Sequence, residues 1–161
     1  MSQQLITVSI TEQTLQLWER GRPVERYRVA TATNGPGERN GSECTPRGWH
    51  RIRACIGGDQ PANAVFKGRR PTGEIYSPAL RREHPQRDWI LTRILWLSGL
   101  QPGFNRFGDV DTMRRYVYIH GCPDEDPMGV PSSHGCVKRR NADVIRLFER
   151  VESGARVLIE E

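Results

Sequence analysis

Hydrophobic and polar residues alternate in the first part of the chain. The alternation has a period of two through residues 5–10 and again through residues 14–19, with a polar turn between them. Successive side chains of a strand point to opposite faces, so this pattern predicts a hairpin of two half-buried strands. A third strand is predicted over residues 24–32, after a Gly-Arg-Pro turn. The chain is therefore expected to open with an antiparallel meander.

Further short extended segments follow, separated by turn-forming residues. Residues 33–48 hold Asn-Gly, Pro-Gly and Thr-Pro pairs and predict a surface loop. Apolar and β-branched residues predict strands over residues 49–56, 89–97 and 116–120. Residues 57–85 are interrupted so often by glycine and proline that no element is predicted there. This segment is a candidate lid.

One segment has helical periodicity. Residues 141–151 carry an apolar stripe at helical spacing, with Asn141 as the expected N-cap and Asp143 in the first turn. Gly154 can end the helix, and residues 155–159 predict a last strand. Because the chain also contains 16 Gly and 11 Pro, we expect a mainly β fold.

Length and charge limit the possible classes of protein. The 161 residues suffice for one well-buried domain, expected to span 1–161. The formal net charge is +5, from 24 basic and 19 acidic residues. No run of five basic residues occurs, and pairs such as Arg114-Arg115 are interpreted as solvated surface, so no nucleic-acid partner is expected.

The location of the protein is also predicted from apolar patterning. No window approaches the roughly 18 apolar residues that would span a bilayer, so no membrane span is expected. The first residues lack the basic and apolar regions of a signal peptide, which predicts a cytoplasmic protein with reduced thiols. Removal of a leader would instead indicate a periplasmic protein.

The candidate chemistry lies in the segment Ser133-His134-Gly135-Cys136. A cysteine attacks a carbonyl as its thiolate, and its ordinary pKa of about 8.5 calls for a partner that removes the proton. His120, at the end of a predicted strand, is the candidate base. Gly135 has no side chain, so backbone N–H groups can approach a substrate oxygen and form an oxyanion hole.

Two other interpretations stay open at this point. His120 and Cys122, like His134 and Cys136, form H-x-C pairs whose side chains share one face of a strand, as ligands of a tetrahedral zinc ion would. Structural zinc pairs more often have two to four intervening residues, and Gly135 has no ligand role, so no metal and no cofactor are expected. Alternatively, Cys136 is an ordinary buried thiol in a non-enzymatic binding module.

The motif resembles the signature of the YkuD-type L,D-transpeptidase family, a histidine followed after a loop by Ser/Thr-His-Gly-Cys. The similarity continues along most of the chain and is poorest over residues 57–85. The further matching features are the hairpin with Leu15-Gln16-Leu17-Trp18, the strand over 24–32, the step Thr45-Pro46-x-Gly48-Trp49 and the helix start Asn141-x-Asp143.

The resemblance implies a fold and a reaction. The fold would be a YkuD-like β-sandwich or barrel-like catalytic domain with one helix after the catalytic cysteine. Cys136 would attack the carbonyl of the third residue of a peptidoglycan stem peptide, usually a diamino acid, and release the terminal D-alanine. Stem peptides or muropeptides are the implied partners, and carbapenem-type inhibitors would acylate the same thiol.

The resemblance also implies roles for the neighbours of the thiol. His120 would take the thiol proton and deliver it to the leaving amine. The carbonyl of Gly121 would orient the imidazole. His134 and Gly135, together with the nucleophile itself, would shape the oxyanion hole, and Ser133 would support the turn.

One departure from the family pattern concerns the residues after the nucleophile. Relatives often carry Arg or Asn two places after the cysteine and an apolar residue next, whereas this chain has Lys138, Arg139 and Arg140. These three are candidate substrate-binding residues, because a cationic rim suits a substrate carboxylate.

The acyl-enzyme can react either with water or with an amine of a second peptide, and the expected cytoplasmic location bears on this choice. It favours water as the acceptor, which predicts an L,D-carboxypeptidase that trims D-alanine from muropeptides in cell-wall recycling. The alternative is an L,D-transpeptidase that forms cross-links through the same acyl-enzyme.

Overall fold

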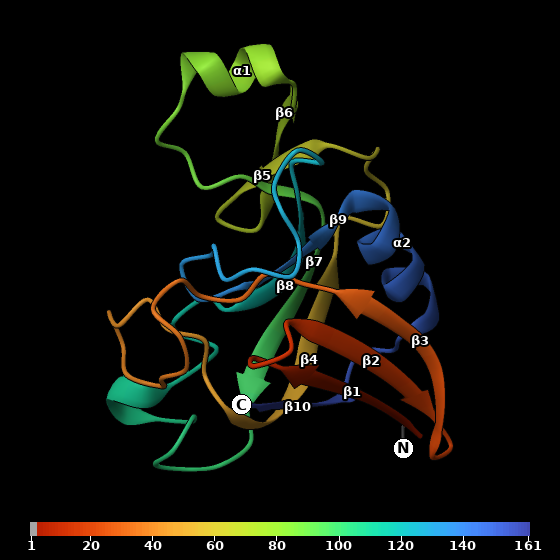
Figure 1. Ribbon diagram of the computed structural model, residues 1–161, viewed down its shortest axis with the longest axis vertical. Coiled ribbons are helices and arrows are strands. Elements are labelled where there is room, and N and C mark those ends of the chain that lie inside the picture. Colours follow the sequence, from red (N-terminus) through yellow and green to blue (C-terminus); the bar gives the residue numbers. More distant parts are fainter. Residues whose placement is uncertain (1–2) are drawn as a thin grey trace.

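The computed structural model describes residues 3–161, which form one strongly curled sheet with helices at its side and at one end (Figure 1). The strand order is β3-β2-β1-β10-β4-β7-β5-β6, with β8 on β7 and β9 on β8. The strands are β1 (Gln4–Ser9), β2 (Thr14–Glu19), β3 (Arg22–Arg28), β4 (Gly48–Ile56), β5 (Ala64–Lys67), β6 (Arg70–Ile75), β7 (Ile90–Gly99), β8 (Tyr118–Cys122), β9 (Val137–Arg140) and β10 (Arg156–Glu160). The mainly β fold class is confirmed.

The predicted meander is confirmed. β1 pairs antiparallel with β2, and β2 pairs antiparallel with β3. The predicted third strand continues to residue 32, whereas β3 ends at Arg28. Beyond Arg28 the chain no longer pairs with β2, and Ala30 forms an isolated bridge to Lys138 of β9. The C-terminal strand β10 lies parallel to β1 and joins the meander to β4. Among residues 3–161, no helix is both long and apolar enough to cross a membrane.

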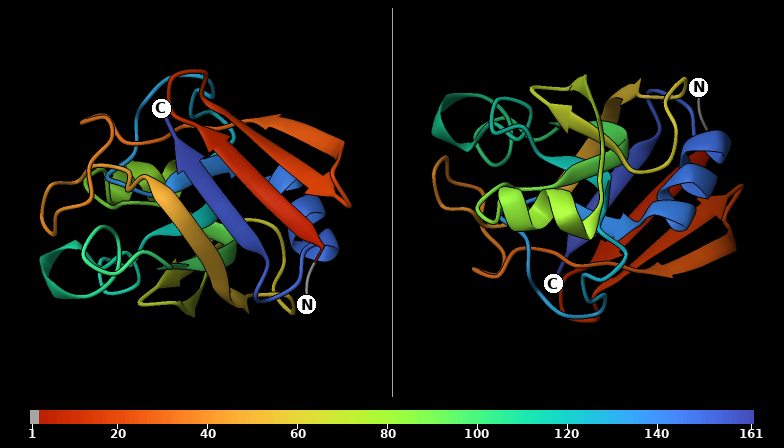
Figure 2. Two further views of the ribbon diagram at one scale, coloured as in Figure 1. Left: turned by 90° about the horizontal axis from the view of Figure 1, so that it is seen from below. Right: turned by 90° about the horizontal axis from the view of Figure 1, so that it is seen from above.

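The main core lies inside the curl of the sheet. The alternating positions Ile6 and Val8 of β1 and Leu15 and Leu17 of β2 are all fully buried. The helix α2 (Asn141–Arg150) covers this core, with its Leu147 among the residues that line it (Figure 2). Burial of alternate aliphatic side chains is what fixes the register of these strands, because a slip of one residue would expose all of them.

The cap of α2 differs from the prediction. The N-cap residue is Arg140, which makes no side-chain cap hydrogen bond, and Asn141 is the first residue of the helix. The Asn141 side chain is buried and accepts a hydrogen bond from Thr92 Oγ1 at 2.6 Å. The prediction of Asn141 as N-cap was wrong, because its side chain fastens the helix to β7 instead of closing the first turn.

The segment without a predicted structure contains a hairpin and a second α-helix. β5 and β6 are joined by Gly68 and Arg69, whose φ values of 56° and 66° suit a tight two-residue hairpin turn. The short helix α1 (Pro78–Glu83) follows, and Ser77 Oγ accepts the Leu80 N–H at 3.1 Å as its cap. The expectation of one helix was therefore incomplete. We call residues 64–88 the arm; it projects at the top of Figure 1.

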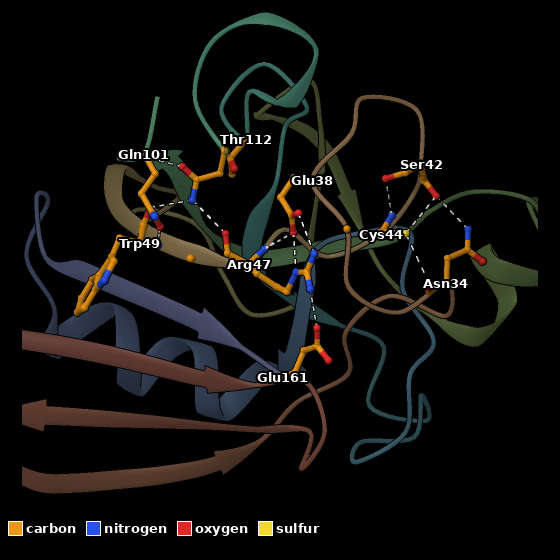
Figure 3. Close-up of polar contacts among 12 residues, drawn as sticks. Asn34, Glu38, Ser42, Cys44, Arg47, Trp49, Gln101, Thr112 and Glu161 are labelled. Carbon is orange, nitrogen blue, oxygen red and sulfur yellow. Dashed lines mark hydrogen bonds and ion pairs between the residues drawn. The ribbon is translucent and has the colours of Figure 1, made fainter. Parts of the chain in front are cut away.

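The predicted surface loop over residues 33–48 is fixed by polar contacts (Figure 3). Arg47 forms an ion pair with Glu38, at 2.9 Å from Nε to Oε2, and another with Glu161. Asn105 Nδ2 donates to the carbonyls of Arg47 and Trp49, both at 3.0 Å. The loop is held against the body of the protein and can position residues near the candidate nucleophile.

Candidate active site

The candidate nucleophile and base are brought together by the parallel pairing of β8 and β9. Ile119 lies opposite Val137, and His120 lies opposite Lys138. Cys136 directly precedes β9, so strand alternation places its side chain on the same face as those of His120 and Lys138. His120 and Cys136 are therefore diagonal neighbours on one face, a spacing that long side chains can bridge.

The candidate base His120 is held in its neutral form. Its side chain is buried, and Nδ1 lies 2.6 Å from the carbonyl oxygen of Gly121. A carbonyl only accepts hydrogen bonds, so Nδ1 carries the hydrogen and Nε2 keeps its lone pair for a proton. Burial lowers the pKa of His120, which keeps the imidazole neutral near pH 7.

Cys136 is held as a neutral thiol. Burial raises the pKa of Cys136 to about 12, although the Tyr118 N–H, 3.3 Å from Sγ, acts in the opposite direction. The sulfur also lies 3.6 Å from the Tyr116 carbonyl oxygen, which can accept the S–H hydrogen. Both candidate groups are thus uncharged at rest, so an attack by this sulfur would require its proton to pass to a base in the same step.

The turn that carries the nucleophile is braced by Ser133. Its Oγ donates to the carbonyl of Cys136 at 2.5 Å and accepts the Gly135 N–H at 3.2 Å. Gly135 has a φ of 128°, which L residues rarely adopt. Because Ser133 already uses the Gly135 N–H, the N–H groups of His134 and Cys136 are the candidates for an oxyanion hole.

Thr45 holds the same turn from the other side. Its Oγ1 donates to the Gly135 carbonyl at 3.0 Å and accepts the Ala32 N–H at 2.9 Å. A Cβ at Gly135 would lie 3.2 Å from the backbone oxygen of Cys44. The Thr-Pro-x-Gly step of the loop therefore packs directly against the nucleophile turn.

Gly121 lies in a space that admits no side chain. A Cβ there would lie 2.5 Å from Asn141 Oδ1 and 2.6 Å from the Leu91 carbonyl oxygen. The pairing of β7 with β8 shifts next to this point, between Leu91 and Ile94. Thr92 sits in that bulge with a φ of 74°, an uncommon value for a β-branched residue. The bulge and Asn141 thus enclose the backbone that orients His120.

The three predicted cationic residues occupy different environments. Lys138 is nearly buried and forms an ion pair with Asp126 at 3.0 Å. Arg140 is exposed and donates to the Asp124 carbonyl at 3.0 Å. These two cations lie near the nucleophile strand, but both already have protein partners.

Arg139 does not lie on the predicted rim. Strand alternation turns it away from the His120 face and into the core, where it is fully buried. Its guanidinium carbon lies 3.8 Å from the centre of the Tyr27 ring. Within residues 3–161, none of its three guanidinium nitrogens has a hydrogen-bond partner. The arginine therefore occupies space within the core instead of a place on the rim of the site.

A cavity of about 440 Å³ opens beside the nucleophile. Its lining includes His134, Gly135 and Cys136, and also Arg69, Asp88, Arg115, Tyr116 and Tyr118. Within residues 3–161, no group of three or more His, Cys, Asp or Glu side chains is arranged to hold a metal ion. The cavity therefore combines one thiol with aromatic rings and charges of both signs.

The sequence of this chain matches the profile of the YkuD L,D-transpeptidase catalytic domain over residues 3–159. The chain belongs to this family. The YkuD match spans nearly every residue described above, including both members of the His120–Cys136 pair. No curated protein is significantly similar to the chain.

Solved structures of L,D-transpeptidases share the fold of this YkuD domain. An L,D-transpeptidase from Mycobacterium smegmatis is 15% identical in sequence and superposes with a TM-score of 0.59. The match covers 99% of this chain and 59% of the M. smegmatis chain. L,D-transpeptidase 3 from Mycobacterium tuberculosis, in complex with a faropenem-derived adduct, is 15% identical with a TM-score of 0.61. The match covers 99% of this chain and 60% of the M. tuberculosis chain. The chain thus spans about three fifths of the length of these proteins, and the likeness shows the fold.

The residues that sequence reasoning missed in this YkuD domain come from separate segments. Arg69 and Asp88 lie in the arm, for which no structure was predicted. Arg115 was interpreted as solvated surface, yet it is half-buried and donates to the Cys44 carbonyl at 2.6 Å. The only available signal for Arg115 was its place directly before the predicted strand that leads to His120.

Proposed function

We propose that this YkuD domain is an L,D-carboxypeptidase that removes the terminal D-alanine from peptidoglycan stem peptides, as in the recycling of muropeptides. The observation that carries the proposal is the neutral pair of His120 and Cys136 on one face of β8 and β9, with the imidazole oriented by Gly121. Membership of the family supports the substrate class, because YkuD domains are L,D-transpeptidase catalytic domains.

The reaction would proceed in two acyl-transfer steps. Cys136 attacks the carbonyl of the third residue while Nε2 of His120 takes the thiol proton. The amide bond then breaks, His120 returns the proton to the leaving amino group, and a thioester remains on the sulfur. In the second step His120 takes a proton from water as the resulting hydroxyl attacks the thioester, and the C–S bond breaks as His120 returns that proton to the sulfur, which frees the acid product and restores the thiol. N–H groups of His134 and Cys136 would stabilise the oxyanion in both steps.

The size of the cavity suits the acylating substrate. At about 440 Å³ it falls in the range of pockets that enclose one ligand of drug size. That is room for the end of a single stem peptide at Cys136. A cross-linking enzyme would in addition have to bring the amine of a second peptide to the thioester.

The second candidate function is L,D-transpeptidation. The observation that favours it is the fold shared with solved L,D-transpeptidases. The first step would be the same, and an amine of a second stem peptide would replace water.

Incubation with a disaccharide tetrapeptide, followed by mass spectrometry, tests both functions. The proposal predicts a tripeptide product that has lost one D-alanine, with no product in Cys136→Ala. A cross-linked dimer as the main product would favour the second function. Unchanged activity in Cys136→Ala would exclude the thiol mechanism altogether.

Acylation by β-lactams gives an independent test of the nucleophile. The related M. tuberculosis enzyme is seen with a faropenem-derived adduct. We expect a carbapenem or penem to add its mass to this protein and to leave Cys136→Ala unmodified. Cys55, whose thiol pKa is raised by burial, provides a matched control, since Cys55→Ala should still take up the adduct.

A further inference from the structure

The outer face of three neighbouring strands carries exposed arginines without counter-charges. β10, β4 and β7 follow one another in the sheet. Strand alternation turns Arg156 of β10 and Arg51 and Arg53 of β4 away from the core, and all three side chains are exposed. Among the ion pairs of residues 3–161, none includes any of these arginines. We call the outward side of β10, β4 and β7 the arginine face.

Two cations of the arginine face lie directly opposite each other. Arg156 is the antiparallel partner of Arg51, and like charges at opposite positions destabilise a pair of strands. The neighbouring outward positions are Trp49, Trp96, Ser98 and Leu158, which carry no negative charge. In the described part of the chain no helix covers β4 and β10 on this side (Figure 2, left). An anion bound between the two arginines would offset their repulsion.

Indole rings support the guanidinium groups of the arginine face. The guanidinium carbon of Arg156 lies 6.0 Å from the centre of the Trp49 ring, and that of Arg53 lies 5.5 Å from the centre of the Trp96 ring. Arg69 also contacts the Trp96 ring, at 4.6 Å. Contact with a ring holds the planar group and leaves N–H donors at its edge for a carboxylate. It also occupies ring faces on which the bases of a nucleic acid would stack.

We propose that the arginine face binds an acidic segment of a polypeptide, whose carboxylates accept paired hydrogen bonds from Arg51, Arg53 and Arg156. Carboxylates match the fork of a guanidinium. Arg51 and Arg53 are two residues apart along β4, and an extended peptide presents alternate side chains with a similar period. The inference goes beyond the proposed function, because none of these arginines lines the cavity beside Cys136.

Fluorescence anisotropy with a labelled peptide of alternating glutamate and serine tests the proposal at low salt. The protein is expected to bind this peptide and not the same peptide with glutamine in place of glutamate. Arg51→Gln and Arg156→Gln are each expected to weaken the binding by about fivefold, the upper end for an exposed ion pair. Arg51→Lys keeps the charge without the planar fork, so it should recover only part of that loss.

A matched control separates the arginine face from the overall charge of the protein. Arg82→Gln removes an exposed arginine of α1 and should leave the affinity unchanged. An equal loss in Arg82→Gln would overturn the inference, and so would unchanged affinity in both Arg51→Gln and Arg156→Gln. Full recovery in Arg51→Lys would contradict the paired hydrogen bonds. Tighter, arginine-dependent binding of an oligothymidylate or of phosphatidylserine vesicles would show that the partner is a nucleic acid or a membrane and not a polypeptide.

The binding measurement does not depend on the proposed function. D-alanine release from a tetrapeptide is expected to be the same in Arg51→Gln, Arg156→Gln and the wild type, because the cavity beside Cys136 contains neither arginine. A thermal melt shows that both variants are folded. Absence of D-alanine release in the wild type would contradict the carboxypeptidase alone. Absence of binding to the glutamate peptide would contradict the acidic partner alone.

Discussion

The pair β8–β9 and the arm contribute to the same cavity but are stabilised in different ways. β8 is buried along its whole length, and its Gly121 packs against Asn141 and Leu91 with no space for a side chain. The arm is buried at β5 and Tyr76 but otherwise largely exposed. Its outer part is fastened by a few polar contacts, such as the Tyr76 hydroxyl to Glu125 at 2.6 Å and Arg81 to Asp126 at 2.7 Å. The candidate reacting groups thus lie on the rigid region, and two charged residues that line the cavity, Arg69 and Asp88, lie on the more exposed one.

The largest expected effect comes from the base on the rigid region. His120→Gln removes the group that takes the thiol proton, and kcat/KM is expected to fall by about 10²–10⁴-fold. The measurement is D-alanine release from a tetrapeptide, with a thermal melt to show that the variant is folded. His84→Gln, an exposed histidine in the arm, serves as the control and should keep full activity.

Packing around the base predicts the next largest effect. Gly121→Ala places a Cβ against Asn141 and the backbone of Leu91, and overpacking of this kind lowers the free energy of unfolding by about 1–3 kcal/mol. Urea unfolding measures it. Gly58→Ala is the matched control, because its Cβ would meet only the edge of the Phe148 ring at 3.1 Å. Equal losses of stability in both variants would show that the packing around Gly121 is no tighter than that around Gly58.

Arg139→Leu is expected to stabilise the protein by about 1–3 kcal/mol. Burial lowers the pKa of Arg139 to about 9, and replacing a buried charge without partners by an apolar side chain of similar size is often stabilising. Arg140→Leu, at the exposed neighbouring position, should change the stability by less than about 0.5 kcal/mol. Loss of kcat/KM in a well-folded Arg139→Leu variant would instead support the predicted role of Arg139 in substrate binding.

The pH dependence tests the neutral state of the pair. His120 must be unprotonated to act as the base, and burial lowers its pKa below 6.5. We therefore expect kcat/KM to rise with pH through a midpoint below 6.5 and then to stay level, falling about tenfold per pH unit on the acid side. A continued rise of kcat/KM above pH 8 would instead indicate that a separate ionisation of Cys136, whose pKa burial raises, limits the rate.

The smallest effect is expected in the arm. Arg81→Gln breaks a partly exposed ion pair with Asp126, so the free energy of unfolding should fall by no more than about 1 kcal/mol. Arg82→Gln, the exposed neighbour, is the control in the same urea series. A loss of several kcal/mol in Arg81→Gln would mean that the arm is as tightly integrated as β8.

Features that depend on neighbouring residues of the chain could be predicted from the sequence. Alternation predicted the hairpin of β1 and β2, which the structure has. The family resemblance singled out His120 and Cys136 as the candidate pair, and the pairing of β8 with β9 places both on one face. β9 could not be predicted, because Lys138, Arg139 and Arg140 carry no apolar alternation and the strand is specified by pairing with β8. Arg69 and Asp88 were missed for a similar reason, since folding of the arm brings them to a cavity whose other residues lie far along the chain.

One carboxylate joins the two regions. Asp126 binds Arg81 of α1 through Oδ1 and Lys138 of β9 through Oδ2, at 2.7 and 3.0 Å. A change of Asp126 leaves both cations without this partner, and a change of either cation leaves one oxygen of Asp126 without its ion pair. In evolution the three positions are therefore expected to vary together, so that the shape of the arm and the strand after the nucleophile are inherited as a unit.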